Sequence, residues 1–359
     1  MRLPKAFFTS LAVLLSAVLA GCGGGAEDST QAEPNQSAAA NEDREVVVYT
    51  ALDRQFSEPI FEDFERETGI AVKAVYDSEA VKTVGLVNRL LAERDRPNAD
   101  VFWNNEIVRS IQLKREGITQ AYDSPAAANI PRTFRDPDNH WTGFAARARV
   151  ICANSELIPD GDYPTGLSAL TDPQWRGRAA FAKPLFGTTN THAAAIWAIV
   201  GEEAFREFWT GALENAVMEA GNAQARDAAA DGAVAWCWTD TDDAFGAIAD
   251  GKPVDIVYAD ALPSEAERNG VMLIPNTVTL IAGAPHPEEG KALIDYLLSE
   301  KVEAKLAQSR SAQIPVRAGV PGPPELPELP ANQVLDIDWE AVADALAPAN
   351  EALVEMLAE

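Results

Sequence analysis

Short runs of strand-forming residues alternate with amphipathic stretches along the first part of the chain. The run EVVVYT at 45–50 is apolar and β-branched, and the stretch FSEPIFEDFERETG after it places its apolar residues at helical spacing before Gly69. Strand-like runs return at 70–76 and 99–105, with a second helical pattern between them. This β-α-β-α-β order predicts a parallel, doubly wound sheet that is covered by helices.

The same alternation resumes after residue 146, and a Pro-rich, extended stretch at 320–333 then precedes one last helix. The chain is therefore expected to be an α/β protein with two domains. The elements expected in this part are strands at 147–155, 178–184 and 233–241, a pair of strands at 270–283, and helices at 190–201, 242–251, 286–308 and 339–357.

The first residues have the layout of a secretory signal. Arg2 and Lys5 precede an apolar run that ends in Leu-Ala-Gly-Cys at Cys22. This site resembles the lipobox of bacterial lipoproteins, which implies that 1–21 are a signal peptide and that Cys22 is lipidated. A plain signal peptide or a membrane anchor is the alternative, although the apolar run is shorter than the ~20 residues that span a bilayer.

Residues 22–44 are mostly Gly, Ala, Ser, Asn and acidic residues without an apolar period, which is typical of a flexible tether. We therefore expect a protein of the periplasm or cell surface that touches the membrane only through its lipid. The chain has 29 basic and 55 acidic residues and a formal net charge of -26, which argues against nucleic acid as a partner. The spread of the acidic residues also fits a solvated surface, so the charge alone does not indicate cation binding.

Besides Cys22, the chain has the cysteines Cys152 and Cys237, each in the centre of an apolar run. In an oxidising compartment these two residues could form a disulfide or remain isolated buried thiols. Neither has a histidine or a second cysteine at metal-ligand spacing, which argues against a zinc site.

Polar residues gather where the expected strands end. Ligands of open α/β sheets bind beyond the carboxyl ends of the strands, so these residues are expected to face one another across a cleft between lobes. The polar segments are 49–53, 76–78, 104–105, 183–189 and 239–243.

The order of elements over about 45–320 resembles the iron(III)-type solute-binding proteins of bacterial ABC importers. The stretches that carry this resemblance are VVVYTALDRQFSEPIFEDFERETGI, ADVFWNNE, WTGFAARARVICANS, DPQWRGRAAFAKPLFGT and IPNTVTLIAGAPHPEEGKALIDYLLSEKVEAKLA, with QIPVR after them. The resemblance implies the two-lobed periplasmic-binding-protein fold, with a doubly wound sheet in each lobe and a hinge between the lobes.

On this basis 45–145 and 272–320 are expected to form lobe 1, and 146–271 to form lobe 2. The segment 321–359 is expected to supply a C-terminal helix that packs on lobe 1. The family order also places Cys152 and Cys237 on neighbouring strands of lobe 2.

The metal ligands of the family are only partly present in this sequence. Ferric-binding relatives carry adjacent tyrosines where this chain has Asp240 and Thr241, some carry a histidine near Asp53, and some carry a glutamate near Asn105. The resemblance therefore implies a variant without the tyrosine pair. Asp53 and Asp240 are its candidate metal ligands because carboxylates suit hard cations, and Tyr49 is a further candidate for the site.

The residues that bind an anion in the family are better matched in this sequence than the metal ligands are. Gly187, Thr188 and Thr189 stand at an expected helix start, where free N–H groups and the helix dipole favour an anion, although ordinary capping is the alternative role for the threonines. Arg147 and Asn222 match positions that lie near the anion in relatives.

The stretch WCWTDTDDAF at 236–245 combines strand-forming aromatics with three carboxylates. We expect Asp240 and Thr241 to emerge at the cleft as ligand groups, because they directly follow a buried strand. Asp242 and Asp243 are expected mainly to cap the following helix.

The leading hypothesis is a monomeric, lipid-anchored solute-binding protein that captures ferric iron with a bridging anion and delivers it to an ABC permease and its ATPase. The alternative ligands are a small phosphonate, a phosphate ester or a carboxylate. A hydrolase or lyase with the aspartates as base, or a ligand-free interaction protein of the envelope, is a weaker alternative. The sequence has no nucleophile elbow, Walker loop or dinucleotide-binding glycine pattern, so no enzyme and no catalytic cofactor are expected.

Overall fold

The computed structural model describes residues 44–77, 84–158, 162–263, 266, 269–329 and 333–358. The expected signal peptide, Cys22 and the tether up to residue 43 lie outside these ranges. Among the helices within them, none is both long and apolar enough to cross a membrane.

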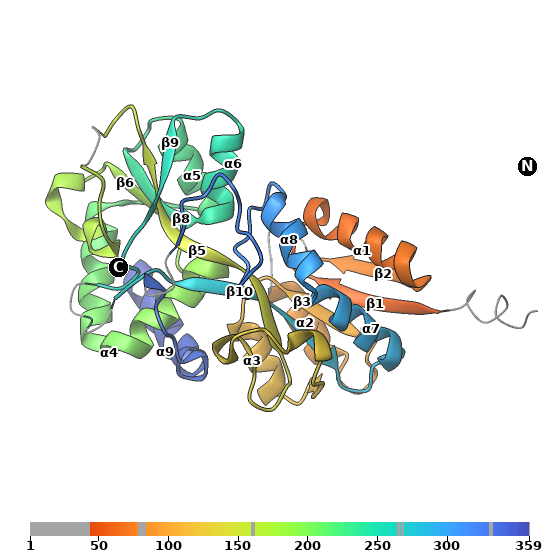
Figure 1. The fold of residues 1–359 in the computed structure, drawn as a ribbon. Coiled ribbons are helices and arrows are strands. Elements are labelled where there is room, and N and C mark those ends of the chain that lie inside the picture. Colours follow the sequence, from red (N-terminus) through yellow and green to blue (C-terminus); the bar gives the residue numbers. More distant parts are fainter. Residues whose placement is uncertain are drawn as a thin grey trace, which may run out of the picture. The chain divides into compact units, whose positions relative to one another are not determined.

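The first group of strands follows the predicted alternation (Figure 1). Strand β1 (Glu45–Thr50) lies between β2 (Ala71–Tyr76) and β3 (Val101–Asn104), and both pairings are parallel. The helices of this part are α1 (Arg54–Thr68), α2 (Val84–Ala92) and α3 (Val108–Arg115). Helix α1 ends at Gly69, whose φ of 69° is the left-handed conformation that glycine adopts without strain.

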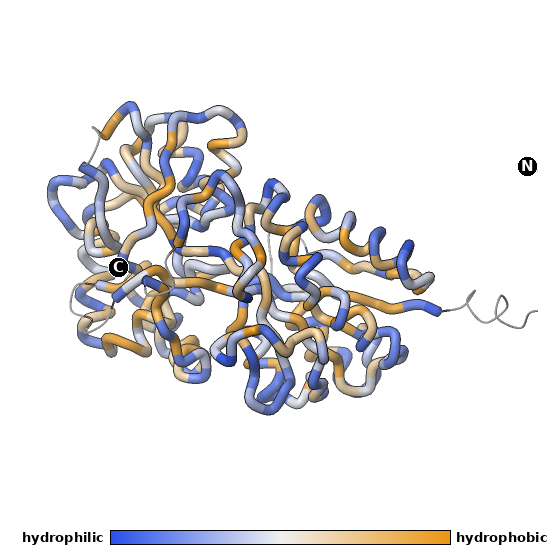
Figure 2. The backbone as a smooth tube through the Cα atoms, viewed as in Figure 1, coloured by the Kyte–Doolittle hydropathy of each residue, from blue (hydrophilic) through white to orange (hydrophobic). Residues whose placement is uncertain are grey.

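Apolar periodicity explains how these helices lie on the sheet. Ile60, Phe61 and Phe64 of α1 are buried, while the exposed side of the helix carries charged residues. Figure 2 shows this as alternating hydrophobic and hydrophilic colouring along α1. Trp103 of β3 is fully buried and its ring meets that of Phe61 edge-on at 5.7 Å, so it belongs to the core.

A second group of strands surrounds β5 (Thr142–Asn154). The C-terminal half of β5, residues 149–154, pairs antiparallel with β8 (Trp236–Asp240) on one side and β9 (Val254–Tyr258) on the other. Strand β8 also pairs in parallel with β6 (Ala179–Ala182), and β6 pairs in parallel with β7 (Val217–Glu219). The helices here are α4 (Gly187–Asn215), α5 (Asn222–Ala230) and α6 (Thr241–Ala249), and α4 contains a break at Gly201.

Strand β5 is longer than the predicted 147–155 because its first residues are also buried, and this length joins the two groups. The N-terminal half of β5, residues 142–148, pairs antiparallel with β10 (Leu273–Ile281), and β10 also pairs antiparallel with β3. The strand order is β2-β1-β3-β10-β5-β8-β6-β7, with β9 on β5 and the short β4 (Thr119–Gln120) on β10. The expected pair of strands at 270–283 is therefore wrong, because one continuous strand occupies this stretch.

A buried network of hydrogen bonds around Glu303 holds β5 where the strand passes from the first group of strands to the second. Ala145 has a φ of 42°, and its N–H donates to Glu303 of α8 (Glu300–Gln308). The second oxygen of Glu303 accepts from Arg317 at 2.7 Å, and Val316 donates its N–H to the first oxygen. The QIPVR segment is thus tied to the crossing strand by a carboxylate that has no solvent exposure.

The remaining elements cover these strands. Helix α7 (Pro287–Leu297) contacts β10 and β1. Within the described residues, short 3₁₀ helices span Pro125–Ala127, Arg132–Phe134, Leu167–Thr171 and Pro173–Trp175.

The C-terminal helix α9 (Trp339–Ala358) packs chiefly along α4, with a smaller contact to α3 (Figure 1). The predicted packing of this helix on lobe 1 stays a prediction, since the helix contacts α3 of the first group as well as α4. Its buried face, which includes Val342, Ala345 and Leu353, shares one apolar cluster with α4 and β8. The lobe boundaries at 145 and 272, and the hinge between them, stay predictions.

The aromatic residues of β8, Trp236 and Trp238, are both buried, as the sequence predicts. They are two positions apart and therefore lie on the same face of the sheet. Trp238 stacks on His192 of α4 at 5.7 Å and donates its indole N–H to His192 Nδ1, which leaves Nε2–H to donate to the carbonyl of Ala261. Burial and the nearby Arg149 lower the pKa of His192 to about 3, so the ring stays neutral.

Cys152 and Cys237 are register partners on β5 and β8, which confirms that they lie on neighbouring strands. Both are buried, free thiols. We expect neither thiol to react with a thiol reagent in the native protein, because burial and the neighbouring Cys152 raise the pKa of the Cys237 thiol and deny access to both. A full-length Cys22→Ser chain should release two reactive thiols only after unfolding. No release on unfolding would show instead that the two residues are oxidised to a disulfide.

Candidate functional site

Asp240, the last residue of β8, lies at the meeting point of four elements of the second group. Its side chain forms an ion pair with Arg149 of β5, with Arg149 Nη1 at 2.7 Å from Asp240 Oδ1. Asp240 is 1% exposed and Arg149 has no exposure. A buried ion pair needs further hydrogen bonds to compensate for the loss of water.

Those hydrogen bonds come from the first turn of α4 and the first residue of α5. The Thr188 hydroxyl and the Asn222 amide both donate to Asp240 Oδ2, the amide at 3.0 Å. The other guanidinium nitrogen of Arg149 donates to the Thr189 hydroxyl at 3.3 Å, and this hydroxyl donates to Asn222 at 3.0 Å. The predicted residues Thr188, Thr189, Asn222 and Asp240 are therefore neighbours in one hydrogen-bonded network.

The charge state of Asp240 follows from this network. Burial by itself raises the pKa of a carboxyl, but the charges of Arg149 and Arg147 and the bond from Thr188 outweigh it and lower the pKa of Asp240 below its ordinary value. The carboxylate is therefore ionised across the physiological pH range.

Arg147 stands two residues before Arg149 on β5, so both side chains leave the same face of the strand. Its Nη1 lies 3.9 Å from Asp240 and 3.8 Å from Asp242, and its Nη2 donates to the backbone carbonyl of Asn105. Burial opposes its charge, but the acidic residues Asp242, Asp240, Asp243 and Asp53 together raise its pKa. Arg147 therefore lies between the strand ends of the first group and the acidic residues of the second.

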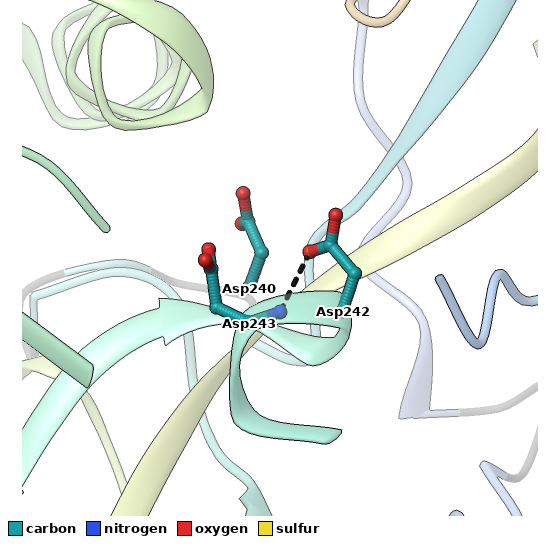
Figure 3. Close-up of side chains that lie close together, drawn as sticks. All are labelled: Asp240, Asp242 and Asp243. Carbon is teal, nitrogen blue, oxygen red and sulfur yellow. Dashed lines mark hydrogen bonds between the residues drawn. The ribbon is translucent and has the colours of Figure 1, made fainter. Parts of the chain in front are cut away.

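The three aspartates of the WCWTDTDDAF stretch point to one side of the chain (Figure 3). One carboxylate oxygen from each of Asp240, Asp242 and Asp243 lies within 4.8 Å of the others. The side chain of Asp242 is 25% exposed, whereas that of Asp240 is only 2% exposed. The open side of the cluster is therefore that of Asp242.

Asp243 is crowded by the other carboxylates. Its Oδ2 accepts from the Thr239 hydroxyl at 3.2 Å, and its N–H donates to Asp242 Oδ1 at 3.1 Å. Burial, with the charges of Asp242 and Asp240, raises the pKa of Asp243 to about 8. A cation bound at the cluster would relieve this repulsion.

The residues of this stretch are only partly arranged as expected. Thr241 is fully buried, and its hydroxyl accepts the N–H of Ala148 at 3.1 Å, while both oxygens of Asp240 have partners inside the protein. Asp240 is the residue at the N-cap of α6, but its side chain makes no capping bond there. The carboxylate of Asp242 is partly exposed, and it also accepts the N–H of Asp243 in the first turn of α6, in line with the expected role at the helix start.

Tyr49 does not lie with the aspartates of this cluster. It packs among the residues under α2, and its hydroxyl donates to Glu93 at 2.9 Å. Burial and Glu93 raise its pKa to about 12, which disfavours the phenolate that a metal would need.

The other predicted residues lie at different edges of the site. Asp53 precedes α1 and interacts electrostatically with Arg147, and Asn105 offers its carbonyl to the same side chain. Gly187 has a φ of 55° at the start of α4 and lines a small cavity with Glu106, Arg109 and Thr191.

Two residues were missed by the sequence reasoning. Arg149 was hidden within a strand, although its spacing of two from Arg147 places both on one face. Glu106 accepts the N–H groups of Val108 and Arg109 at the start of α3 and also the hydroxyl of Thr191 in α4 at 3.0 Å. It thus connects the two groups of strands through one buried carboxylate.

Comparisons with known proteins agree with this architecture. The model of a family described as bacterial extracellular solute-binding protein matches residues 98–345. Iron uptake protein A1 of Synechocystis sp. is 26% identical over 321 residues, which cover 88% of this chain and 87% of that protein. The Fe(3+)-binding periplasmic protein of Serratia marcescens is 23% identical over 89% of this chain and 91% of its own.

Among solved structures, iron-bound HitA from Pseudomonas aeruginosa matches with a TM-score of 0.76 and 22% identity, covering 87% of this chain and 99% of that chain. At this identity the likeness concerns the fold. It confirms the two-lobed periplasmic-binding-protein fold that the resemblance implies.

We expect Asp240→Asn to lower the free energy of unfolding by about 3 kcal/mol, the cost of leaving a buried charge without its partner, here Arg149. Asp242→Asn should change stability much less, because its carboxylate is partly exposed. Urea denaturation of both variants measures the difference. Equal stabilities would show that the Arg149–Asp240 pair contributes nothing beyond a surface interaction.

The ligand-free protein should lose stability as pH rises from about 4 to about 8. The folded-state pKa of Asp243, about 8, lies above its unfolded value near 4, so its contribution is fully present below the unfolded pKa and is lost as pH rises through the folded pKa. Asp243→Asn should flatten this dependence and stabilise the protein above pH 8. Denaturation at pH 6 and pH 9 tests this, and an unchanged slope in the variant would contradict it.

Proposed function

Because this chain belongs to the family of bacterial extracellular solute-binding proteins, we propose that it is the binding component of an ABC importer for ferric iron. The observation that carries the proposal is the cluster of Asp240, Asp242 and Asp243, whose oxygens lie within 4.8 Å of one another. Carboxylate oxygens are hard ligands and suit a hard, highly charged cation. The two curated relatives with iron in their names support the same cargo.

Within the cluster, Asp242 and Asp243 are the proposed direct ligands. Asp240 already accepts bonds from Arg149, Thr188 and Asn222, so it contributes its charge more than a free lone pair. Asp53 is the proposed ligand from the first group of strands, because it interacts with the same guanidinium of Arg147 as Asp242 does.

The finer features belong to the same proposal. Cys22 carries a lipid and tethers the protein to the membrane from the periplasm, and the chain acts as a monomer. The lobes 45–145 with 272–320 and 146–271 close over the cargo about a hinge, and the closed form delivers it to a permease with its ATPase. In this proposal the carboxylate of Asp240 takes the place of the bridging anion that the sequence analysis expected near the first turn of α4, because it already accepts bonds from Arg149, Thr188 and Asn222.

A second candidate cargo is a small phosphonate or carboxylate that carries an amine. The buried Arg147 guanidinium lies 3.8 Å from the partly exposed Asp242, and its Nε has no hydrogen-bond partner among the described residues. A zwitterion could place its acidic group on Arg147 and its ammonium group on Asp242.

Titration with a ferric chelate, followed by calorimetry and metal analysis, tests the proposal. Asp242→Asn and Asp243→Asn should each weaken iron binding by roughly tenfold or more, as expected for a charged ligand group whose interaction contributes about 1.5 to 3 kcal/mol. Asp250→Asn is the matched control, because Asp250 ends the same helix and pairs with Arg310 on the surface. Iron binding that all three variants retain would place the metal elsewhere.

The colour of the iron-loaded protein is a further check. Tyrosine phenolates bound to ferric iron give an intense visible charge-transfer band, and Tyr49 is held by Glu93 away from the aspartates. The loaded protein should therefore lack this band. A saturable response to an aminophosphonate without any response to iron would favour the second candidate.

A further inference from the structure

The side chains around Asp240 are of the kind that bind a free oxyanion. They comprise the guanidinium of Arg149, the hydroxyl of Thr188 and the amide of Asn222, all within hydrogen-bond distance of the carboxylate. Thr188 and Thr189 also stand in the first turn of α4, where backbone N–H groups and the helix dipole favour negative charge. Arg147 adds a second positive charge 3.9 Å from Asp240 Oδ2.

These donors also bond to one another. Arg149 also donates to the hydroxyls of Thr188 and Thr189, and the Asn222 amide donates to Thr188 at 2.9 Å. Arg149 Nε has no hydrogen-bond partner among the described residues, although the side chain has no solvent exposure. A buried guanidinium in such a place requires an anion, whether or not that anion belongs to the chain.

We propose that Arg149, Thr188, Thr189 and Asn222 form an oxyanion-binding site that the chain fills with its own carboxylate, that of Asp240. The ligand class of the site is a small carboxylate or a similar oxyanion. The site is closed to external anions in the wild-type protein because its donors are already occupied.

One consequence rests on the proposed function. If the cargo is ferric iron, the negative charge that neutralises Arg149 is built into the protein. Iron binding then needs no added anion at the first turn of α4. This differs from the sequence-based expectation of an external bridging anion at Thr188 and Thr189.

The test of the site uses Asp240→Ala, which removes the carboxylate and leaves space for formate. Thermal unfolding of this variant is measured in sodium formate and in sodium chloride of equal ionic strength. We expect the variant to melt well below wild type and to recover saturably in formate but not in chloride, while wild type responds equally to both salts. Equal responses of the variant to the two salts would overturn the proposal.

Two further variants make the result specific. Asp240→Asn fills the same space with an amide and should be destabilised without a formate response. The double variant Asp240→Ala/Arg149→Met lacks the guanidinium and should also show no formate response. If Asp240→Ala does not fold alone, refolding from urea with formate should restore its yield, and failure to refold with formate would also overturn the proposal.

A separate measurement addresses iron. Wild-type protein is titrated with a ferric chelate with and without added phosphate or bicarbonate, and we expect the same affinity in each case. Absence of iron binding under all conditions would contradict the proposed function and leave the formate result intact. Iron binding that requires an added anion, together with no formate rescue, would contradict the internal anion alone.

Discussion

The ion pair between Arg149 and Asp240 is the constraint on which the second half of the molecule depends. Two charged side chains are removed from water, and each can be stable only if the other stays in place. The pair and its partners hold β5, β8, α4 and α5 at a single point. The positions of Arg147 and of the acidic cluster follow from it, because both lie within two or three residues of the pair along the chain.

Residues 240–243, Asp-Thr-Asp-Asp, have different roles because the chain passes here from the end of β8 into the first turn of α6. Asp240 still belongs to β8 and points into the protein, Thr241 bonds back to the neighbouring strand, and Asp242 is partly exposed. Three aspartates within four positions therefore differ in role. Asp240 is the counterion of Arg149, Asp242 is a partly exposed candidate ligand, and Asp243 is a candidate ligand whose pKa is raised by its neighbours. Burial and the nearest charges decide which role each one takes.

The alternation of strands and helices could be predicted from the sequence, because each element repeats its apolar period over enough residues to be recognised. The local roles of Asp240 and Asp242 could not, since they depend on Arg149, Thr188 and Asn222, which lie 18 to 91 residues away. Tyr49 was misplaced for a related reason. A tyrosine near a strand end can point to either face, and Glu93 of a distant turn fixes which one it takes.

Strand β5 has one more consequence, which concerns how the chain folds. Its 13 residues complete the first group of strands with one half and the second group with the other. Its partner β10 comes more than 100 residues later in the chain, so neither group can finish its core before that distant segment arrives. The two halves therefore cannot behave as independent folding units, and loosening β5 in one of them weakens the cooperativity of both.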